Sequence, residues 1–241
     1  MSGPILNFVD VSAGYGALTV LGGVTLALGQ DEVLAVLGAN GSGKSTVLKT
    51  AIGLTRMTAG QVQFAGQDIS DLPPHRRATL GMGYVPQTRN VFADLSVLDN
   101  LRMGGFARRD PIDDDIEAVF ALFPRLRDRR RTRAGTLSGG ERRMLSIGLT
   151  LLLRPKMLLL DEPSSDLAPG MVTQVFEALR RIRETRRIPV LIVEQNVRAA
   201  LDFADRICVM VRGRVALDVS RADVEVSQLH ALFLDGGVRE A

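Results

Sequence analysis

The glycine-rich segment 38–46 constrains the fold of this chain more than any other stretch. It reads Gly-Ala-Asn-Gly-Ser-Gly-Lys-Ser-Thr and fits the pattern G-x-x-x-x-G-K-[ST]. The apolar run 33–37 precedes it, and residues 47–52 after it suit a helix. A strand, a glycine loop and a helix in this order form a phosphate-binding loop. The segment therefore predicts an α/β fold that binds phosphate groups.

Each part of this loop has a physical role in holding an anion. Glycines let backbone N–H groups turn toward phosphate oxygens, and the next helix points its positive end at the same place. Lys44 adds a charge for the β- and γ-phosphates, and the Ser45 hydroxyl is placed for Mg²⁺. The candidate nucleotide-binding residues of the loop are Gly38, Asn40, Gly41, Ser42, Gly43, Lys44, Ser45 and Thr46.

Two carboxylates end a later apolar run. Leucines fill positions 158–160, and Asp161 and Glu162 follow directly. A buried strand beside the phosphate loop would deliver both carboxylates to the γ-phosphate. Asp161 suits a Mg²⁺ ligand acting through water, and Glu162 suits the general base that activates an attacking water. Many strands end in acids, so the interpretation depends on the phosphate loop upstream.

Residues 137–141, Leu-Ser-Gly-Gly-Glu, form a second glycine motif, directly before the helical run 142–153. A glycine-rich helix N-terminus can bind an anion. Taken alone, the motif is also compatible with an ordinary glycine turn. If it does bind an anion, the chain has two helix ends that accept phosphate.

The composition limits the class of protein. A chain of 241 residues can form one large α/β domain or two small ones, and its net charge of +3 is too small and dispersed to indicate nucleic acid binding. We find no apolar run of about 18 residues and no export signal at the N-terminus. Cys208, the single cysteine, lies in an apolar run and is interpreted as a buried core residue, which fits the cytosol.

Hydrophobic periodicity and turn residues predict the order of elements. Strands are expected over 5–11, 24–28, 33–37, 61–64, 82–85, 156–160 and 189–193, with a hairpin of 206–211 and 214–219 and with glycines at 14, 16, 22 and 23 interrupting the first strands. Helices are expected over 97–103, 113–123, 169–187 and 226–234. Ser96 is the expected N-cap of the first, and Pro124 is expected to end the second, which begins at Asp113 and runs through Phe123. Strand signals are sparse from about 88 to 153, which indicates a helical insert.

A run of arginines over residues 125–133 leaves two interpretations open. It is typical of a solvated turn, and it also suits contact with a partner or with anionic lipid headgroups.

With these motifs in order, the chain resembles the nucleotide-binding subunits of ATP-binding-cassette transporters over essentially its full length. The resemblance places Tyr15 against adenine, and places Gln87, in the Tyr-Val-Pro-Gln segment 84–87, at Mg²⁺ and at the link to the helical insert. It implies one domain over 1–241, with a P-loop core, a mixed central sheet, flanking helices and an N-terminal antiparallel β-subdomain. The core would span 1–87 and 154–241, and the inserted helical subdomain 88–153.

The resemblance also implies an assembly. Two such subunits pack head to tail, so that Ser138, Gly139, Gly140 and Glu141 of one chain face the nucleotide held by Lys44 of the other. ATP would join the dimer, and hydrolysis would remove a charge that both chains hold. Membrane permease subunits would contact the insert after Gln87, including residues 89–101.

Two positions depart from the family pattern. Gln195 stands where a histidine usually contacts the γ-phosphate. Glutamine can donate a hydrogen bond but cannot carry charge or shuttle a proton, so Glu162 remains the candidate base, with Lys44 and Gln195 as further catalytic candidates. Ala168 stands where an aspartate usually bridges the two chains.

The Val-Glu-Gln-Asn segment 193–196 and the Leu-Ala-Pro-Gly segment 167–170 resemble the ATPase subunits of branched-chain (hydrophobic) amino acid importers, whose relatives serve urea or short amides. This implies ATP and Mg²⁺ as cofactors, location at the cytoplasmic face of the plasma or inner membrane, and permease subunits and a second ATPase as partners. A periplasmic or extracellular binding protein would act indirectly. The alternatives are an exporter ATPase of the lipopolysaccharide-export type and an ATPase that works on ribosomes or DNA.

Overall fold

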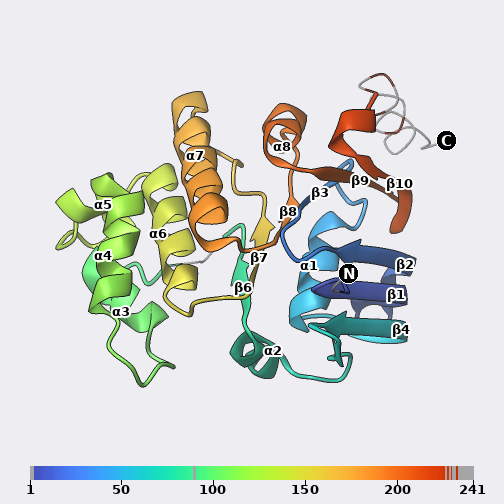
Figure 1. Cartoon of the computed structure of the whole chain (residues 1–241), viewed down its shortest axis with the longest axis horizontal. Helices are drawn as coiled ribbons and strands as arrows, with labels where there is room; N and C mark the ends of the chain where they lie inside the picture. Colours follow the sequence, from blue (N-terminus) through green and yellow to red (C-terminus); the bar gives the residue numbers. More distant parts are fainter. Residues whose placement is uncertain (1–2, 89–90, 226, 228, 230–231, 233–241) are drawn as a thin grey trace.

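The computed structural model describes residues 3–88, 91–225, 227, 229 and 232, and its strands form two sheets (Figure 1). The central sheet contains β3 (Val33–Leu37), β6 (Met82–Val85), β7 (Met157–Asp161), β8 (Val190–Val193), β9 (Arg206–Val211) and β10 (Arg214–Ser220), in the order β10-β9-β3-β8-β7-β6. The second sheet contains β1 (Leu6–Tyr15), β2 (Leu18–Leu28), β4 (Arg56–Phe64) and β5 (Gln67–Asp68), in the order β2-β1-β4-β5.

The central sheet is mixed, as expected from the sequence. Strands β6, β7, β8, β3 and β9 pair in parallel, and β10 returns antiparallel to β9 as the predicted hairpin. Every residue of β3, β7 and β8 is buried, because these strands are apolar and covered on both faces. Parallel strands end at a common edge, so the loops that follow β3, β6, β7 and β8 leave the sheet on the same side.

The antiparallel sheet corrects three strand boundaries, and one of them is the start of β4 at Arg56 in place of the expected 61. The sequence indicated that the first strand ends at residue 11 and the second begins at 24, but β1 and β2 run on to a tight turn after Tyr15. Their pairing contains register shifts, which hide the alternation of apolar residues. Gly14 lies inside β1, and no side chain fits at this position because a Cβ would lie 1.9 Å from the Leu18 carbonyl oxygen. Gly22 and Gly23 lie inside β2.

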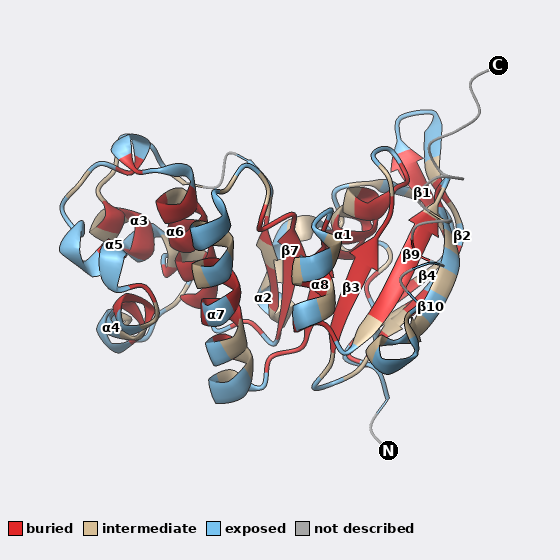
Figure 2. Ribbon diagram, turned by 90° about the horizontal axis from the view of Figure 1, so that it is seen from above, coloured by how far each residue is buried: buried red, intermediate tan, exposed pale blue. Residues whose placement is uncertain are grey.

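The helix that follows the phosphate loop, α1 (Lys44–Ile52), lies between the two sheets (Figure 2). Val47 and Leu48 of α1 share one core with Leu34 of the central sheet and Phe8 of the antiparallel sheet. Cys208 is buried in the same core, as predicted, and burial raises the pKa of its thiol to about 12. Side chains from both sheets therefore pack against α1 and fix its position.

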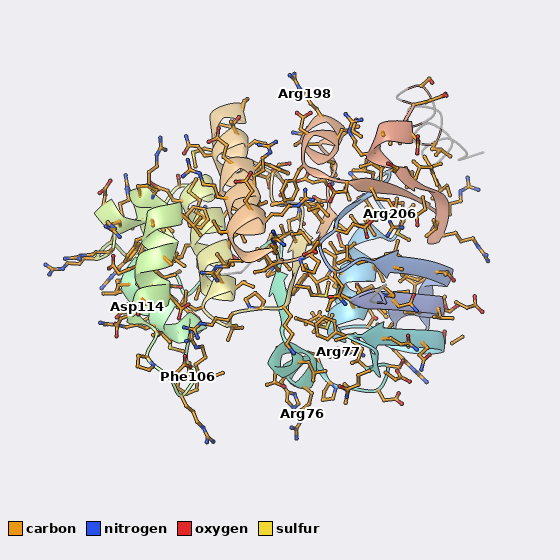
Figure 3. The ribbon with its side chains drawn as sticks, in the orientation of Figure 1. Arg76, Arg77, Phe106, Asp114, Arg198 and Arg206 are labelled. Carbon is orange, nitrogen blue, oxygen red and sulfur yellow. The ribbon has the colours of Figure 1, made fainter. Side chains whose placement is uncertain are left out.

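The C-terminal end of α1 is held by a helix that the sequence did not indicate. This helix, α2 (Pro74–Leu80), begins with a proline at its first turn, where a missing N–H costs nothing. Arg77 of α2 is buried and donates hydrogen bonds to the carbonyl oxygens of Thr50 (2.7 Å) and Ala51 (2.8 Å) (Figure 3). The Thr50 carbonyl oxygen also accepts from the Gly53 N–H at 3.1 Å, so Arg77 adds to the backbone cap at this helix end.

The helical insert consists of α3 (Val97–Gly104), α4 (Asp113–Leu122), α5 (Pro124–Asp128) and α6 (Gly139–Leu151), and no strand is assigned among residues 91–153. Ser96 caps α3 as predicted, since its Oγ accepts from the Asp99 N–H. The expectation for Pro124 was incomplete. The helix from Asp113 ends at Leu122, and Pro124 begins the next helix.

Two helices complete the other face of the central sheet. The predicted amphipathic helix is α7 (Pro169–Arg186), and α8 (Val197–Phe203) was not indicated by the sequence. Their rings Phe176 and Phe203 meet edge to face, with centroids 5.5 Å apart. The terminal helix expected over 226–234 falls largely outside the described residues. None of the described helices is long and apolar enough to cross a membrane.

Candidate nucleotide site

The loop between β3 and α1 has the conformation that a phosphate cradle requires. Gly38, Gly41 and Gly43 have φ angles of 151°, 78° and 101°, which residues with a side chain rarely adopt. A Cβ at Gly38 would lie 2.4 Å from the Met210 carbonyl oxygen, whereas a Cβ at Gly41 would meet nothing within 4 Å. The loop is therefore packed against β9 at Gly38 and open at Gly41, where an anion can approach the backbone.

Lys44 and Ser42 are arranged for an anion. The Lys44 ammonium is buried and donates to the carbonyl oxygens of Gly38 and Ala39, both at 2.8 Å. An ammonium has three donors, so one remains for a phosphate oxygen. Burial lowers the pKa of Lys44, while Glu162 and Asp161 oppose that change. Ser42 Oγ is the one buried side-chain oxygen or nitrogen of the described residues without a hydrogen-bond partner, and a phosphate oxygen fits this need.

The expected Mg²⁺ ligands Ser45 and Asp161 meet. Ser45 Oγ donates to Asp161 Oδ1 at 2.8 Å, although 116 positions separate the residues. The Tyr84 hydroxyl donates to Asp161 Oδ2 at 3.3 Å, and burial together with Asp161 raises the pKa of Tyr84. In the described part of the chain, no three His, Cys, Asp or Glu residues cluster to hold a metal. A hydroxyl and one carboxylate fit Mg²⁺, which keeps water and phosphate among its ligands.

Glu162 follows β7 and has two amide partners. Gln87 Nε2 donates to its Oε2 at 2.8 Å, and Gln195 Nε2 donates to its Oε1 at 2.7 Å. Gln87 comes after β6 and Gln195 after β8, the two neighbours of β7 in the sheet. Glu162 has a φ of 46° and is buried, yet it lines a cavity of about 880 Å³ between this edge of the sheet and the helices α7 and α8.

Tyr15 ends β1 and is 42% exposed. The ammonium of Lys49, on the last turn of α1, lies 5.9 Å from the ring centroid. A partly exposed aromatic face beside the phosphate-loop helix has the chemistry to stack on a nucleotide base.

The second glycine motif caps α6. Ser138 Oγ accepts from the Glu141 N–H, and the Glu141 carboxylate accepts from the Ser138 N–H at 2.9 Å, forming a capping box. Arg129, from the arginine run, pairs with Glu141 at 3.2 Å. Burial opposes ionisation of Glu141, but the bonds from Ser138 and the charge of Arg129 prevail, so its pKa is lowered. The Arg129 side chain is half exposed, which fits a solvated segment. Contact of the arginine run 125–133 with a partner or with lipid headgroups stays a prediction.

The structure brings Lys44, Ser45, Gln87, Asp161, Glu162 and Gln195 together at one edge of the sheet. It does not bring Ser138, Gly139, Gly140 and Glu141 to that place. Figure 1 shows α6, which begins at Gly139, and α1, which begins at Lys44, on opposite sides of β6 and β7.

Sequence reasoning assigned no role to the buried side chains of Arg143 and Glu194. Arg143 lies three positions after Gly140, on a helix whose N-terminus was noted, and Glu194 lies between a strand and Gln195. The signal that could have identified them is a charge directly beside an apolar run, 144–145 after Arg143 and 190–193 before Glu194.

A phosphate loop, a strand-end aspartate bonded to its serine and a buried glutamate together define an ATP-binding site on an α/β fold. The family model for ABC transporters matches residues 21–165. This chain belongs to the ABC transporter family and is an ABC ATPase.

Comparison with relatives supports the same family. The chain is 41% identical to a probable branched-chain amino acid transport ATP-binding protein LivF of Archaeoglobus fulgidus, covering 89% of this chain and 91% of that protein. It is 41% identical to the branched-chain amino acid transport ATP-binding protein BraG of Pseudomonas aeruginosa, covering 96% and 100%. It is 33% identical to the lipopolysaccharide export system ATP-binding protein LptB of Escherichia coli, covering 87% and 88%.

Solved structures show the same fold. A nucleotide-free ATP-binding cassette from an ABC transporter aligns with a TM-score of 0.83 at 24% identity, covering 98% of this chain and 100% of that one. The ADP conformation of MJ1267, another such cassette, aligns with a TM-score of 0.80 at 25% identity, covering 95% and 98%.

Proposed function

We propose that this ATPase energises the import of branched-chain (hydrophobic) amino acids or related small amides, from the cytoplasmic face of the membrane. The observation that carries the proposal is the 41% identity to two branched-chain amino acid transport ATP-binding proteins over nearly the whole chain. The match to the lipopolysaccharide-export ATPase is weaker, at 33%. Gln195 also favours import, since the family resemblance places a histidine there in exporters.

The residues at the sheet edge have distinct roles in the proposed hydrolysis. The loop N–H groups and Lys44 hold the β- and γ-phosphates, and Tyr15 stacks on adenine. Ser45, Asp161 and Gln87 would hold Mg²⁺, which neutralises charge on the phosphate oxygens. Glu162 accepts a proton from the attacking water as the water oxygen bonds to the γ-phosphorus and the bond to the ADP oxygen breaks. Gln87 and Gln195 orient the Glu162 carboxylate.

We further propose that the helical subdomain of residues 88–153 completes the site of a second cassette, while residues 1–87 and 154–241 form the nucleotide-binding core. The reasoning is geometric. The helix that the glycine motif 137–141 begins, α6, lies on the other side of β6 and β7 from α1, which begins at Lys44 (Figure 1). An anion bound at that helix end is therefore brought by another chain, of the same or of a related sequence. Permease subunits would contact the segment up to Leu101, and Arg89 and Asn90 of that segment lie outside the described residues.

Reconstitution tests this proposal. The tagged chain is purified with its membrane partners and placed in liposomes, and ATP hydrolysis and uptake of labelled leucine are measured with the binding protein outside. We expect leucine to stimulate both activities, and Lys44→Ala to abolish them and to weaken ATP binding strongly. Stimulation by urea or a short amide instead would reassign the cargo. Recovery of ribosomal or DNA-repair proteins without any permease subunit would contradict the transport role.

A further inference from the structure

Two buried charged side chains hold the backbone of the turn that begins at Glu162, and neither is among the candidate nucleotide-binding, metal-binding or catalytic residues. Arg143 of α6 donates from Nη2 to the Glu162 carbonyl oxygen at 3.2 Å. Glu194, at the end of β8, accepts from the Ser164 N–H at 2.9 Å. The turn 162–164 is thus bound on one side of Pro163 to the helical insert and on the other side to the central sheet.

Arg143 joins three segments. It is 5% exposed, and besides Glu162 it donates to the carbonyl oxygens of Pro86 (2.9 Å) and Gln87 (3.0 Å). These are backbone acceptors at fixed places, so the planar guanidinium transmits any shift of α6 to Gln87 and Glu162 together. The same helix begins at Ser138, which we place against the nucleotide of a second chain.

Glu194 joins the turn to Gln195. It is 1% exposed, and its carboxylate also accepts from Ser164 Oγ (2.8 Å), the Gln195 N–H (3.1 Å) and the Asn196 N–H (3.3 Å). Gln195 in turn donates to the Glu162 carboxylate. Glu194 therefore fixes Glu162 twice, through the backbone of the turn and through the amide that contacts its side chain.

Glu162 needs such support because its backbone is strained. A φ of 46° at a residue with a side chain is sparsely populated and persists only where surrounding contacts hold it. Catalysis by a general base depends on placing the carboxylate within hydrogen-bond reach of the water. A change in the turn would move that carboxylate away from the γ-phosphate without changing the phosphate loop.

We propose that Arg143 and Glu194 are positioning residues that hold Glu162 for hydrolysis, and that Arg143 links the position of α6 to the base of its own chain. Engagement of Ser138 with a nucleotide in the second site then acts on hydrolysis in the first. This inference rests on the proposed role of Glu162 as the base.

Arg143→Gln and Glu194→Gln test the inference, with Arg181→Gln and Glu184→Gln at exposed positions of α7 as matched controls. The measurements are kcat for ATP hydrolysis and the Kd for ATP, the latter by equilibrium binding. We expect kcat to fall about 10- to 100-fold in both test variants while Kd stays within about twofold, because misplacement of the base affects the chemical step and not binding. Both controls should hydrolyse ATP normally.

If Arg143→Gln or Glu194→Gln fails to fold, two milder substitutions test the positioning inference instead. Ser164→Ala removes one bond to Glu194 and keeps the backbone N–H, and Arg143→Lys keeps the charge but cannot reach three carbonyls. We expect a partial loss of kcat in both variants. An unchanged kcat in both would overturn the inference, and so would a change in the Kd for ATP with no change in kcat. Glu162→Gln is measured alongside. If it hydrolyses ATP normally, the proposed base is wrong; if it is inactive while the Arg143 and Glu194 variants are normal, only the positioning inference fails.

Discussion

Gln195 Nε2 donates a 2.7 Å hydrogen bond to Glu162 Oε1, across 33 positions of sequence, and joins the ends of two neighbouring strands. With Gln87 on the other carboxylate oxygen, Glu162 is held by two uncharged donors. An amide donates but accepts no proton at neutral pH, so Glu162 is the one member of this trio that can take the proton of an attacking water. The arrangement separates orientation of the carboxylate from proton transfer.

Glu162→Gln should keep ATP binding and stop hydrolysis. The amide has nearly the shape of the carboxylate but is no base, and loss of a general base lowers kcat by about 10²- to 10⁴-fold. With hydrolysis blocked, ATP should hold the dimer together, and gel filtration with ATP should show it. Turnover near the native rate would mean that another group accepts the proton.

Substitutions at Gln195 should distinguish the effect of its hydrogen-bond donor on ATP hydrolysis from the effect of its side-chain shape. Gln195→His keeps a donor near Glu162 and should be tolerated or mildly activating. Gln195→Glu keeps the shape, removes the donor and sets a like charge beside Glu162, so kcat should fall about tenfold or more. Steady-state ATP hydrolysis measures both. Complete loss of activity in Gln195→His would show that the glutamine has a role of its own.

Gly38→Ala and Gly41→Ala should differ strongly. At Gly38 the new methyl meets the Met210 carbonyl oxygen at 2.4 Å and Ser42 Oγ at 2.6 Å, so the loop must move. At Gly41 the methyl meets nothing within 4 Å, and the cost is backbone strain of about 1–2 kcal/mol. Thermal unfolding with and without ATP should show the larger loss of stability and of ATP-induced stabilisation for Gly38→Ala. Equal effects would contradict the described loop.

Acid should weaken the attachment of α4 to the segment that follows α6. Asp115 of α4 accepts from Arg108 at 2.6 Å and from Arg154 at 2.9 Å, and Arg108 also pairs with Asp110. Burial opposes ionisation of Asp115, but the bonds from the arginines prevail and lower its pKa. Hydrogen bonds from Arg108 lower the pKa of Asp110 to about 2, from an ordinary value of 3.8.

Because these pKa values are lower in the folded state, the unfolded chain binds more protons as the pH falls. The stabilisation is present above pH 3.8 and is lost as the pH falls toward about 2. Asp115→Asn should lower the free energy of unfolding at pH 7 by about 1–3 kcal/mol, and the difference from the native chain should narrow at low pH. Urea titrations measure this. Asp114→Asn, exposed on the same helix, is the control (Figure 3), and an equal effect there would refute the assignment.

Much of the element order could be predicted from the sequence because strong local patterns carry it. The strand 82–85 and the hairpin after residue 205 came from apolar runs bounded by proline or glycine. The helices α2 and α8 were missed because each has only seven residues, too few for a clear period. The ends of β1 and β2 were missed because bulges break their alternation.

The sequence by itself determined which chemistry is present: the phosphate loop, two carboxylates after an apolar run, and a capped glycine motif, since each is a local pattern of residue types. The tertiary structure alone decided which of these meet. Ser45 reaches Asp161 because parallel strands end at one edge. The motif at the start of α6 stays apart from the phosphate loop because α6 lies on the other side of β6 and β7 from α1 (Figure 1). The bonds of Arg143 and Glu194 to the turn at Glu162 depend on the packing of distant segments, which no local pattern records.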